Sequence, residues 1–216
     1  MDADELKVQR LNVLLLGGPQ SGKSATGNAL LGSVDFPSRL SPGAVTRECR
    51  LGRRAFPAFL RRQGSEVTLQ LRVLDTPAYP SPGLSSEQAR ERIVGNVERA
   101  LDPGPHAVAL VRRADVPFGE EDARLVHLAQ DLLGPAWRSH TLLVLSHSDS
   151  LHRAGMRGEE YLKQAPEALQ ALLESLGHRH HFLDNSAAWL QIEGRPLLDK
   201  LLAIARHNKY QALQLR

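Results

Sequence analysis

The stretch from Gly17 to Ser24 has the composition and spacing of a loop that binds phosphate. It runs Gly-Gly-Pro-Gln-Ser-Gly-Lys-Ser and fits the pattern G-x-x-x-x-G-K-[ST]. Its glycines let the backbone bend so that successive N–H groups point at one anion. We expect Lys23 to reach the outer phosphates and the Ser24 hydroxyl to bind Mg²⁺. The candidate phosphate-binding residues are Gly17, Gly18, Pro19, Gln20, Ser21, Gly22, Lys23, Ser24 and Ala25.

Two elements must position this loop, and the sequence predicts both of them. An apolar run at 12–16 precedes the loop, and a helix-like segment at 25–31 follows it. A strand, a glycine-rich turn and a helix N-terminus together form a cradle for phosphate. The alternative is a Gly/Ser turn that resembles the pattern by chance, and the two flanking elements argue against it.

Further downstream, two oxygen-bearing side chains are candidates for the same site. Asp75 ends an apolar strand, where a P-loop protein places the carboxylate that holds Mg²⁺ through water. Thr46 lies in the loop before the first predicted hairpin, where a hydroxyl can close over the γ-phosphate and the metal. Together with Ser24 these are the predicted metal ligands. A capping role for Asp75 in a turn is the alternative.

Strand-like and helical patterns alternate along most of the chain. We expect strands at 11–16, 49–56, 67–74, 107–111, 141–145 and 181–183, the second and third of them forming a hairpin. We expect helices at 23–31, 88–100, 120–133, 159–176 and 196–205, with Pro166 kinking or dividing the fourth. Such repeated units predict an α/β fold of three layers, with helices on both faces of a mostly parallel sheet.

Composition narrows the class of protein. The chain has 216 residues, a net charge of +3 and one cysteine, Cys49, which excludes an internal disulfide framework. The N-terminus lacks the apolar segment of a signal peptide, and no apolar run is long enough to span a membrane. We therefore expect a cytoplasmic protein. An arginine-rich stretch between Arg47 and Arg72 suits either an anionic partner or a solvated hairpin, but it has too few aromatic residues for us to expect nucleic acid.

Several segments are similar to the GTPases of the immunity-associated protein (IMAP) family, which have an avirulence-induced type of G domain. The resemblance is greatest to the short, tail-less form. It is carried by Lys23-Ser24-Ala25-Thr26-Gly27-Asn28, Thr46-Arg47-Glu48-Cys49, Asp75-Thr76-Pro77 and Asp184-Asn185-Ser186, and by a box from His106 to Gly134. It covers residues 10–205, so we divide the chain into an N-terminal extension (1–9), a G domain (10–206) and a C-terminal tail (207–216).

The resemblance implies a P-loop GTPase-like fold that binds GTP and GDP with Mg²⁺. It also implies self-association that depends on nucleotide and involves the switch regions. Ala78, His147 and Asn185 fall at positions that contact the nucleotide in that family. Apart from the resemblance, residues 206–216 could lengthen the last helix and dock on a partner or membrane surface, but their apolar residues are too few to anchor them. We expect Trp137 and Trp189 to pack in the core or against helix ends.

The chain departs from the family pattern at several functional positions. Ala78 replaces a glycine, and Ser148 and Ser150 replace the lysine and aspartate that read guanine, with Asp149 one residue early. No Gln or His follows Asp75 to orient water, so we expect hydrolysis to be slow or absent. Two alternatives stay open: a pseudo-GTPase interaction module with unselective or lost nucleotide binding, and a P-loop kinase.

Overall fold

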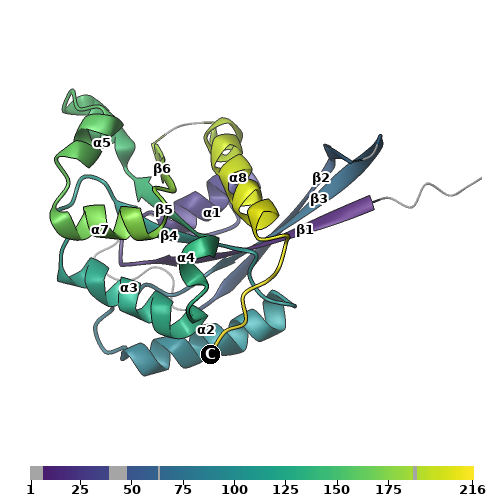
Figure 1. Cartoon of the computed structure of the whole chain (residues 1–216), viewed down its shortest axis with the longest axis horizontal. Helices are drawn as coiled ribbons and strands as arrows, with labels where there is room; N and C mark the ends of the chain where they lie inside the picture. Colours follow the sequence, from purple (N-terminus) through teal and green to yellow (C-terminus); the bar gives the residue numbers. More distant parts are fainter. Residues whose placement is uncertain (1–6, 39–47, 63, 187–188) are drawn as a thin grey trace, which may run out of the picture.

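The computed structural model describes residues 7–38, 48–62, 64–186 and 189–216. Within them the centre of the molecule is a six-stranded sheet in the order β2-β3-β1-β4-β5-β6 (Figure 1). Only the β2–β3 hairpin is antiparallel among the described strand pairings of this sheet. The strands are β1 (Lys7–Gly17), β2 (Arg50–Arg62), β3 (Ser65–Asp75), β4 (Ala107–Arg113), β5 (Thr141–Ser146) and β6 (His180–Phe182).

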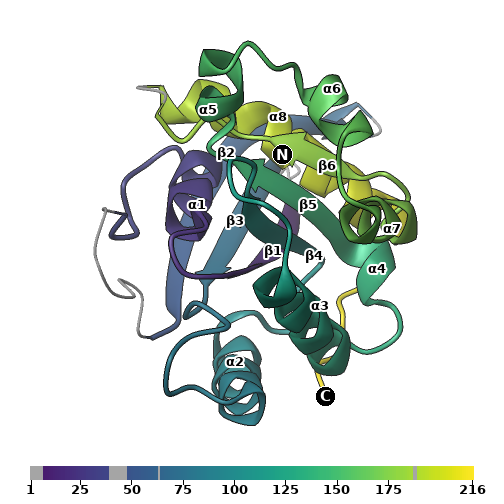
Figure 2. The ribbon, with the colours of Figure 1, turned by 90° about the vertical axis from the view of Figure 1, so that its left-hand side faces the viewer.

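Helices cover both faces of this sheet, which confirms the predicted three-layer α/β fold (Figure 2). On one face, α1 (Lys23–Leu31) and α8 (Leu190–His207) pack against alternate residues of β1 and β3 such as Leu15 and Leu71. On the other, α2 (Ser86–Ala100) and α3 (Glu120–Leu133) pack against Leu14 and Leu74. Successive side chains of a strand point to opposite faces of the sheet, so each of these strands contributes to both hydrophobic cores.

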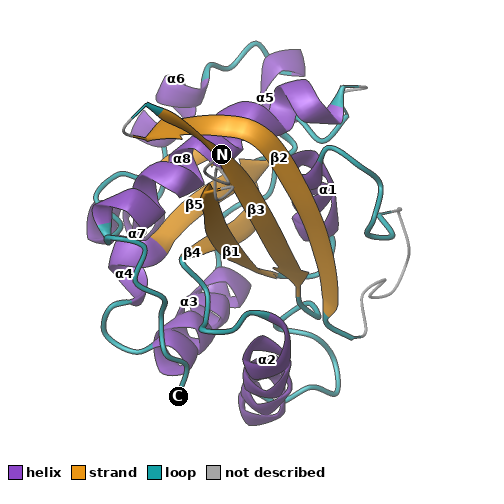
Figure 3. Cartoon of the chain, turned by 90° about the vertical axis from the view of Figure 1, so that its right-hand side faces the viewer, coloured by secondary structure: helices purple, strands orange, loops and turns teal. Residues whose placement is uncertain are grey.

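The antiparallel hairpin lies at one edge of the sheet, and Figure 3 shows β2, β3 and β1 side by side. β1 begins earlier than predicted because its first residues pair with β3, from Lys7 opposite Val67 onward. β2 is likewise longer than the apolar pattern predicted, and its register shifts between Phe56 and Leu60 at a bulge. Strand length here follows the partner strand rather than the apolar run.

The region after β5 contains more short helices than the sequence predicted. Pro166 divides the predicted fourth helix, because α6 (Gly158–Lys163) ends before it and α7 (Glu167–Ser175) begins after it. The short helices α4 (Trp137–His140) and α5 (Ser148–Arg153) were not predicted, since segments of this length carry no helical period. Among the described residues, no helix has the length and apolar character to cross a bilayer.

The C-terminal part of the chain shows two features that the sequence did not predict. α8 ends at His207, and the tail then runs back along the domain toward α2 and α3 (Figure 1). There Leu213 is buried, its N–H donates to Pro105 O over 2.8 Å, and Arg216 N–H donates to Leu132 O over 3.0 Å. Trp137 is fully buried as expected, whereas Trp189 is 73% exposed at the N-terminus of α8.

Candidate nucleotide-binding site

The loop between β1 and α1 has the backbone shape that an anion cradle requires. Gly22 precedes α1 with φ +83°, a left-handed conformation that favours glycine, and no side chain caps the helix. Gly17 is needed for a different reason: an added Cβ would lie 2.7 Å from Val111 O. The N–H groups in the first turn of α1 therefore have no side-chain cap and suit phosphate oxygens.

Three predicted residues converge at this loop. Lys23 Nζ lies 3.0 Å from Asp75 Oδ1, and the Ser24 hydroxyl donates to Asp75 Oδ2 over 2.6 Å. The Lys23 ammonium also donates to the carbonyl oxygen of Thr76. Hydroxyl and carboxylate oxygens are the donors that Mg²⁺ prefers, so the pair of Ser24 and Asp75 fits this metal.

The segment after β3 is fixed against the phosphate loop. The Thr76 hydroxyl donates to Leu15 O over 2.7 Å, and the Tyr79 N–H donates to Gly17 O over 3.1 Å. Ala78, at the position of the family's glycine, is buried between these two anchors. Thr46, the third predicted metal ligand, lies outside the described residues.

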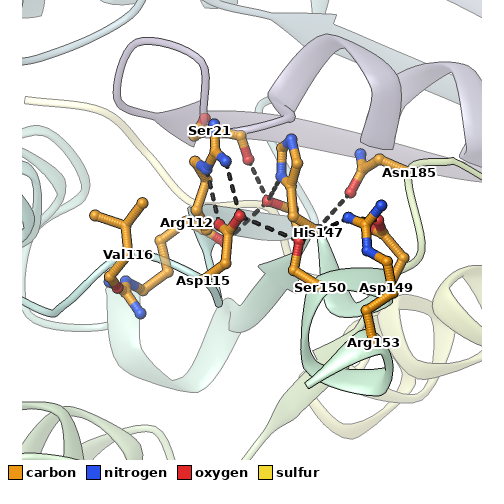
Figure 4. A network of polar contacts seen from close by, with 11 residues as sticks. Ser21, Arg112, Asp115, Val116, His147, Asp149, Ser150, Arg153 and Asn185 are labelled. Atoms are coloured by element: carbon orange, nitrogen blue, oxygen red, sulfur yellow. Dashed lines mark hydrogen bonds and ion pairs between the residues drawn. The ribbon is translucent and has the colours of Figure 1, made fainter. Parts of the chain in front are cut away.

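On the opposite flank of the loop, hydrogen bonds connect three segments that are distant in sequence (Figure 4). The N–H of His147, which has φ +56° at the start of α5, donates to Asn185 Oδ1 over 2.9 Å. The Asn185 amide donates to Gly22 O over 3.5 Å, and the Ser146 hydroxyl donates to Ser21 O over 2.5 Å. His147 and Asn185 thus lie beside the phosphate loop. Burial and the nearby Arg113 guanidinium lower the pKa of His147.

Polar residues that the sequence did not single out complete this flank. Arg113 and Asp115, at the end of β4, form a bidentate ion pair with both N···O distances at 2.8 Å. The Ser150 hydroxyl donates to Asp115 Oδ2 over 3.2 Å. Asp149, by contrast, is bound by Arg153 at 2.6 Å on its own helix. In the sequence, Arg113 and Asp115 are two charged residues shortly after a buried strand. Composition alone does not distinguish such a pair from a solvated turn.

The sequence matches the model of the AIG1 family over residues 11–212. It is 31% identical to immune-associated nucleotide-binding protein 8 of Arabidopsis thaliana over 175 residues, which are 81% of this chain and 47% of the relative. Protein 4 of the same series, also from Arabidopsis thaliana, is 29% identical over 81% of this chain and 51% of its own length. The chain therefore spans about half the length of these curated relatives.

Solved structures share the fold at lower identity. Toc33 from Arabidopsis thaliana, in a dimerization-deficient mutant form, has a TM-score of 0.65 and 22% identity, over 95% of this chain and 87% of Toc33. A mutant form of Era from Aquifex aeolicus has a TM-score of 0.59 and 19% identity, over 92% of this chain and 56% of Era. At these identities the similarity shows the fold alone, that of P-loop GTPases. The family match over nearly the whole chain therefore leads to one conclusion: the chain belongs to the AIG1 family, the IMAP type that its motifs resemble.

Proposed function

We propose that this protein is a Mg²⁺-dependent guanine-nucleotide switch with weak or absent intrinsic hydrolysis. The observation that carries the proposal is the convergence of Lys23, Ser24 and Asp75 at a helix N-terminus without a side-chain cap. Two comparisons support it: the relatives are named nucleotide-binding proteins, and Toc33 has been solved with GDP and Mg²⁺ and with GMPPNP and Mg²⁺.

Different residues of the phosphate loop are proposed to bind different parts of a polyphosphate. The first N–H groups of α1, together with the loop from Gly17 to Gly22, donate to phosphate oxygens. The Lys23 ammonium, which contacts Asp75 in this structure, turns toward the outer phosphates. Ser24 and Asp75 would hold Mg²⁺, together with Thr46 from the loop before β2. When bound, the metal neutralises charge on the phosphates.

The flank that contains His147 and Asn185 is proposed to face the base. The His147 ring contacts the Ser146 hydroxyl, and the Asn185 side chain contacts the His147 N–H and Gly22 O, so both side chains lie beside the phosphate loop. The Asn185 side chain bridges His147 and Gly22. A base bound beside His147 and phosphates bound at Gly22 would therefore both stabilise the two hydrogen bonds of Asn185. Ala25, next to Ser24 in the first turn of α1, adds its backbone to the cradle.

Slow hydrolysis follows from the residues behind Asp75. In GTPases a side chain such as Gln orients the attacking water. Here that segment supplies Ala78 and Tyr79, both buried, and Ala78 restricts the peptide flip that a glycine permits. We expect multiple turnover close to the rate of a protein-free blank.

A second candidate function is a pseudo-GTPase interaction module that binds any nucleoside triphosphate loosely or none. The observation that favours it is the loop from Ser146 to Leu151, named here the base-reading loop, where Ser148 and Ser150 offer hydroxyl groups in place of a lysine and an aspartate.

Nucleotide-dependent self-association through the switch regions belongs to the first proposal. Light scattering with GDP and with GMPPNP tests it, since equal masses in both states would contradict it.

The experiment that separates the two functions is a titration of nucleotide-free protein with fluorescent GTP, GDP and ATP analogues, with and without Mg²⁺. The switch proposal predicts micromolar or tighter guanine binding that needs Mg²⁺ and is lost in Lys23→Ala. Equal affinity for GTP and ATP would indicate an unselective cradle. A protein that binds none of the three nucleotides would be a pseudo-GTPase.

A further inference from the structure

The base-reading loop lacks a carboxylate at position 150, but a carboxylate from another strand lies beside that position. The Ser150 hydroxyl donates to Asp115 Oδ2 over 3.2 Å (Figure 4). An aspartate is longer than a serine by about one bond, so a carboxylate at position 150 would extend into the space next to Asp115. The charge that the sequence loses at 150 is therefore present nearby in the fold.

Strand pairing brings this carboxylate to the loop. β4 and β5 are parallel neighbours, and Arg113 lies opposite Ser146 in their register. Residues that follow β4 must therefore lie beside the turn that leads from β5 into α5. Asp115 and Ser150, 35 positions apart in the chain, meet for this reason.

Arg113 fixes the charge and the orientation of Asp115. Its Nε and one terminal nitrogen each lie 2.8 Å from a different oxygen of the carboxylate. This contact holds the pKa of Asp115 at about 2. The carboxylate accepts three hydrogen bonds in this network, two from Arg113 and one from Ser150. A carboxylate has about four acceptor sites, so two are available to a ligand once the Ser150 hydroxyl turns to another acceptor. The side chain is 21% exposed, so a ligand can approach it.

Arg113, the cationic member of this ion pair, also borders the phosphate loop. Arg113 lines a cavity of about 450 Å³ together with the segment from Gly18 to Ser21. Asp149 in α5 and Asp184 next to Asn185 have other partners: Arg153 binds Asp149, and Asp184 accepts from the N–H and the hydroxyl of Ser186. Asp115 is the carboxylate that contacts position 150 directly.

We propose that Asp115 reads the guanine base in place of the missing carboxylate at position 150, and that Arg113 positions it. Guanine presents two neighbouring donors, the N1–H and the N2 amino group, and an ionised carboxylate accepts from both. Adenine has no such pair, so this contact selects guanine. The inference rests on the proposed nucleotide binding and names the residue that gives it selectivity.

The test is the ratio of ATP to GTP dissociation constants, measured by fluorescence with Mg²⁺ for wild type, Asp115→Asn, Ser150→Asp and the double variant. Asp115→Asn is expected to lower the ratio about tenfold or more, since hydrogen bonds to charged groups are the strong ones. It should also improve binding of xanthosine triphosphate, because the carboxamide N–H can donate to the oxygen at C2. Asp149→Asn is the matched control and should leave the ratio unchanged.

The variant Ser150→Asp distinguishes base reading by Asp115 from the alternative, in which Asp115 does not contact the base. With Asp115 in place, a second carboxylate in contact with it repels the first, so the ratio should fall. In the double variant the new aspartate acts alone, and the ratio should recover. If Asp115 does not read the base, Ser150→Asp alone raises the ratio or leaves it unchanged, and either result overturns the inference.

The outcomes also distinguish this inference from the proposed function. A wild type that binds GTP selectively, with Asp115→Asn equally selective, overturns the inference and leaves the function intact. Equal wild-type affinity for GTP and ATP overturns the inference and leaves nucleotide binding. A wild type that binds neither overturns both. If Asp115→Asn does not fold, as judged by its thermal transition, Ser150→Asp decides the matter by the direction of its change.

Discussion

The buried ammonium of Lys23 lies 3.0 Å from Asp75 Oδ1, and the two residues come from α1 and β3. The cation proposed for the phosphates and the carboxylate proposed for the metal are thus partners of each other. Both side chains are almost inaccessible, at 5% and 0% exposed, so each needs the other to offset its burial. The candidate nucleotide site and the stability of the domain therefore share one ion pair.

Replacing one member of this pair should impair both properties. Asp75→Asn leaves the Lys23 ammonium buried without its counter-charge, and we expect the free energy of unfolding to fall by about 3–5 kcal/mol. Mg²⁺-dependent nucleotide affinity should be lost in the same variant. Urea denaturation and nucleotide titration measure the two effects. The double variant Lys23→Met/Asp75→Leu should recover part of the stability and none of the binding. A double variant as unstable as Asp75→Asn would contradict this explanation.

A close approach of α8 to α1 predicts opposite effects for two glycine substitutions. A Cβ on Gly194 would overlap the backbone oxygen of Ala29, which cannot move as a side chain can. Gly194→Ala should therefore lower the free energy of unfolding by about 1–3 kcal/mol. Gly95, inside α2, is the matched control: its nearest neighbour is the end of Arg99 at 3.7 Å, so Gly95→Ala should stabilise by about 0.4–1 kcal/mol. Thermal denaturation would refute the explanation if both variants shifted in the same direction.

Cys49 should make stability fall in alkaline solution. Burial, and then the Asp75 carboxylate, raise the pKa of its thiol from 9.0 to about 11. Below pH 9 the thiol is neutral in both the folded and unfolded states, so it has no effect on stability there. As the pH rises from 9 to 11 only the unfolded chain ionises, which destabilises the fold by about 1–3 kcal/mol. Denaturation at several pH values should show a steeper alkaline loss in wild type than in Cys49→Ala, and parallel curves would count against this pKa.

The N-terminus of α2 offers a matched test of helix capping. The Ser85 hydroxyl accepts from Gln88 N–H, and the Gln88 side chain accepts from Ser85 N–H, so the two form a capping box. Ser85→Ala should cost about 1 kcal/mol of stability. Ser86→Ala removes an equivalent hydroxyl one residue later and should stay within about 0.5 kcal/mol of wild type. Equal effects in chemical denaturation would mean that the capping box does not form in solution.

Much of this protein could be predicted from local sequence. The phosphate loop depends on glycines and on a strand and helix directly beside it, so its shape is a local property. The bounds of α1 and α3 were predicted residue for residue, since their ends carry glycines that stop the helix or precede it. Parallel pairing followed from the alternation of strands and helices, because only a crossover connects such strands.

Other features depend on which distant residues meet, and the sequence does not contain that information in local form. Lys23 reaches Asp75 across 52 positions, and Ser150 reaches Asp115 across 35. Trp189 is exposed and Leu213 buried because of where the two ends of α8 lie. The sequence alone determined the phosphate loop, the order of the strands and of the longer helices, and the family. Tertiary structure decided that the Asp115 carboxylate lies beside Ser150, because the parallel register of β4 and β5, rather than proximity in the chain, brings those side chains together.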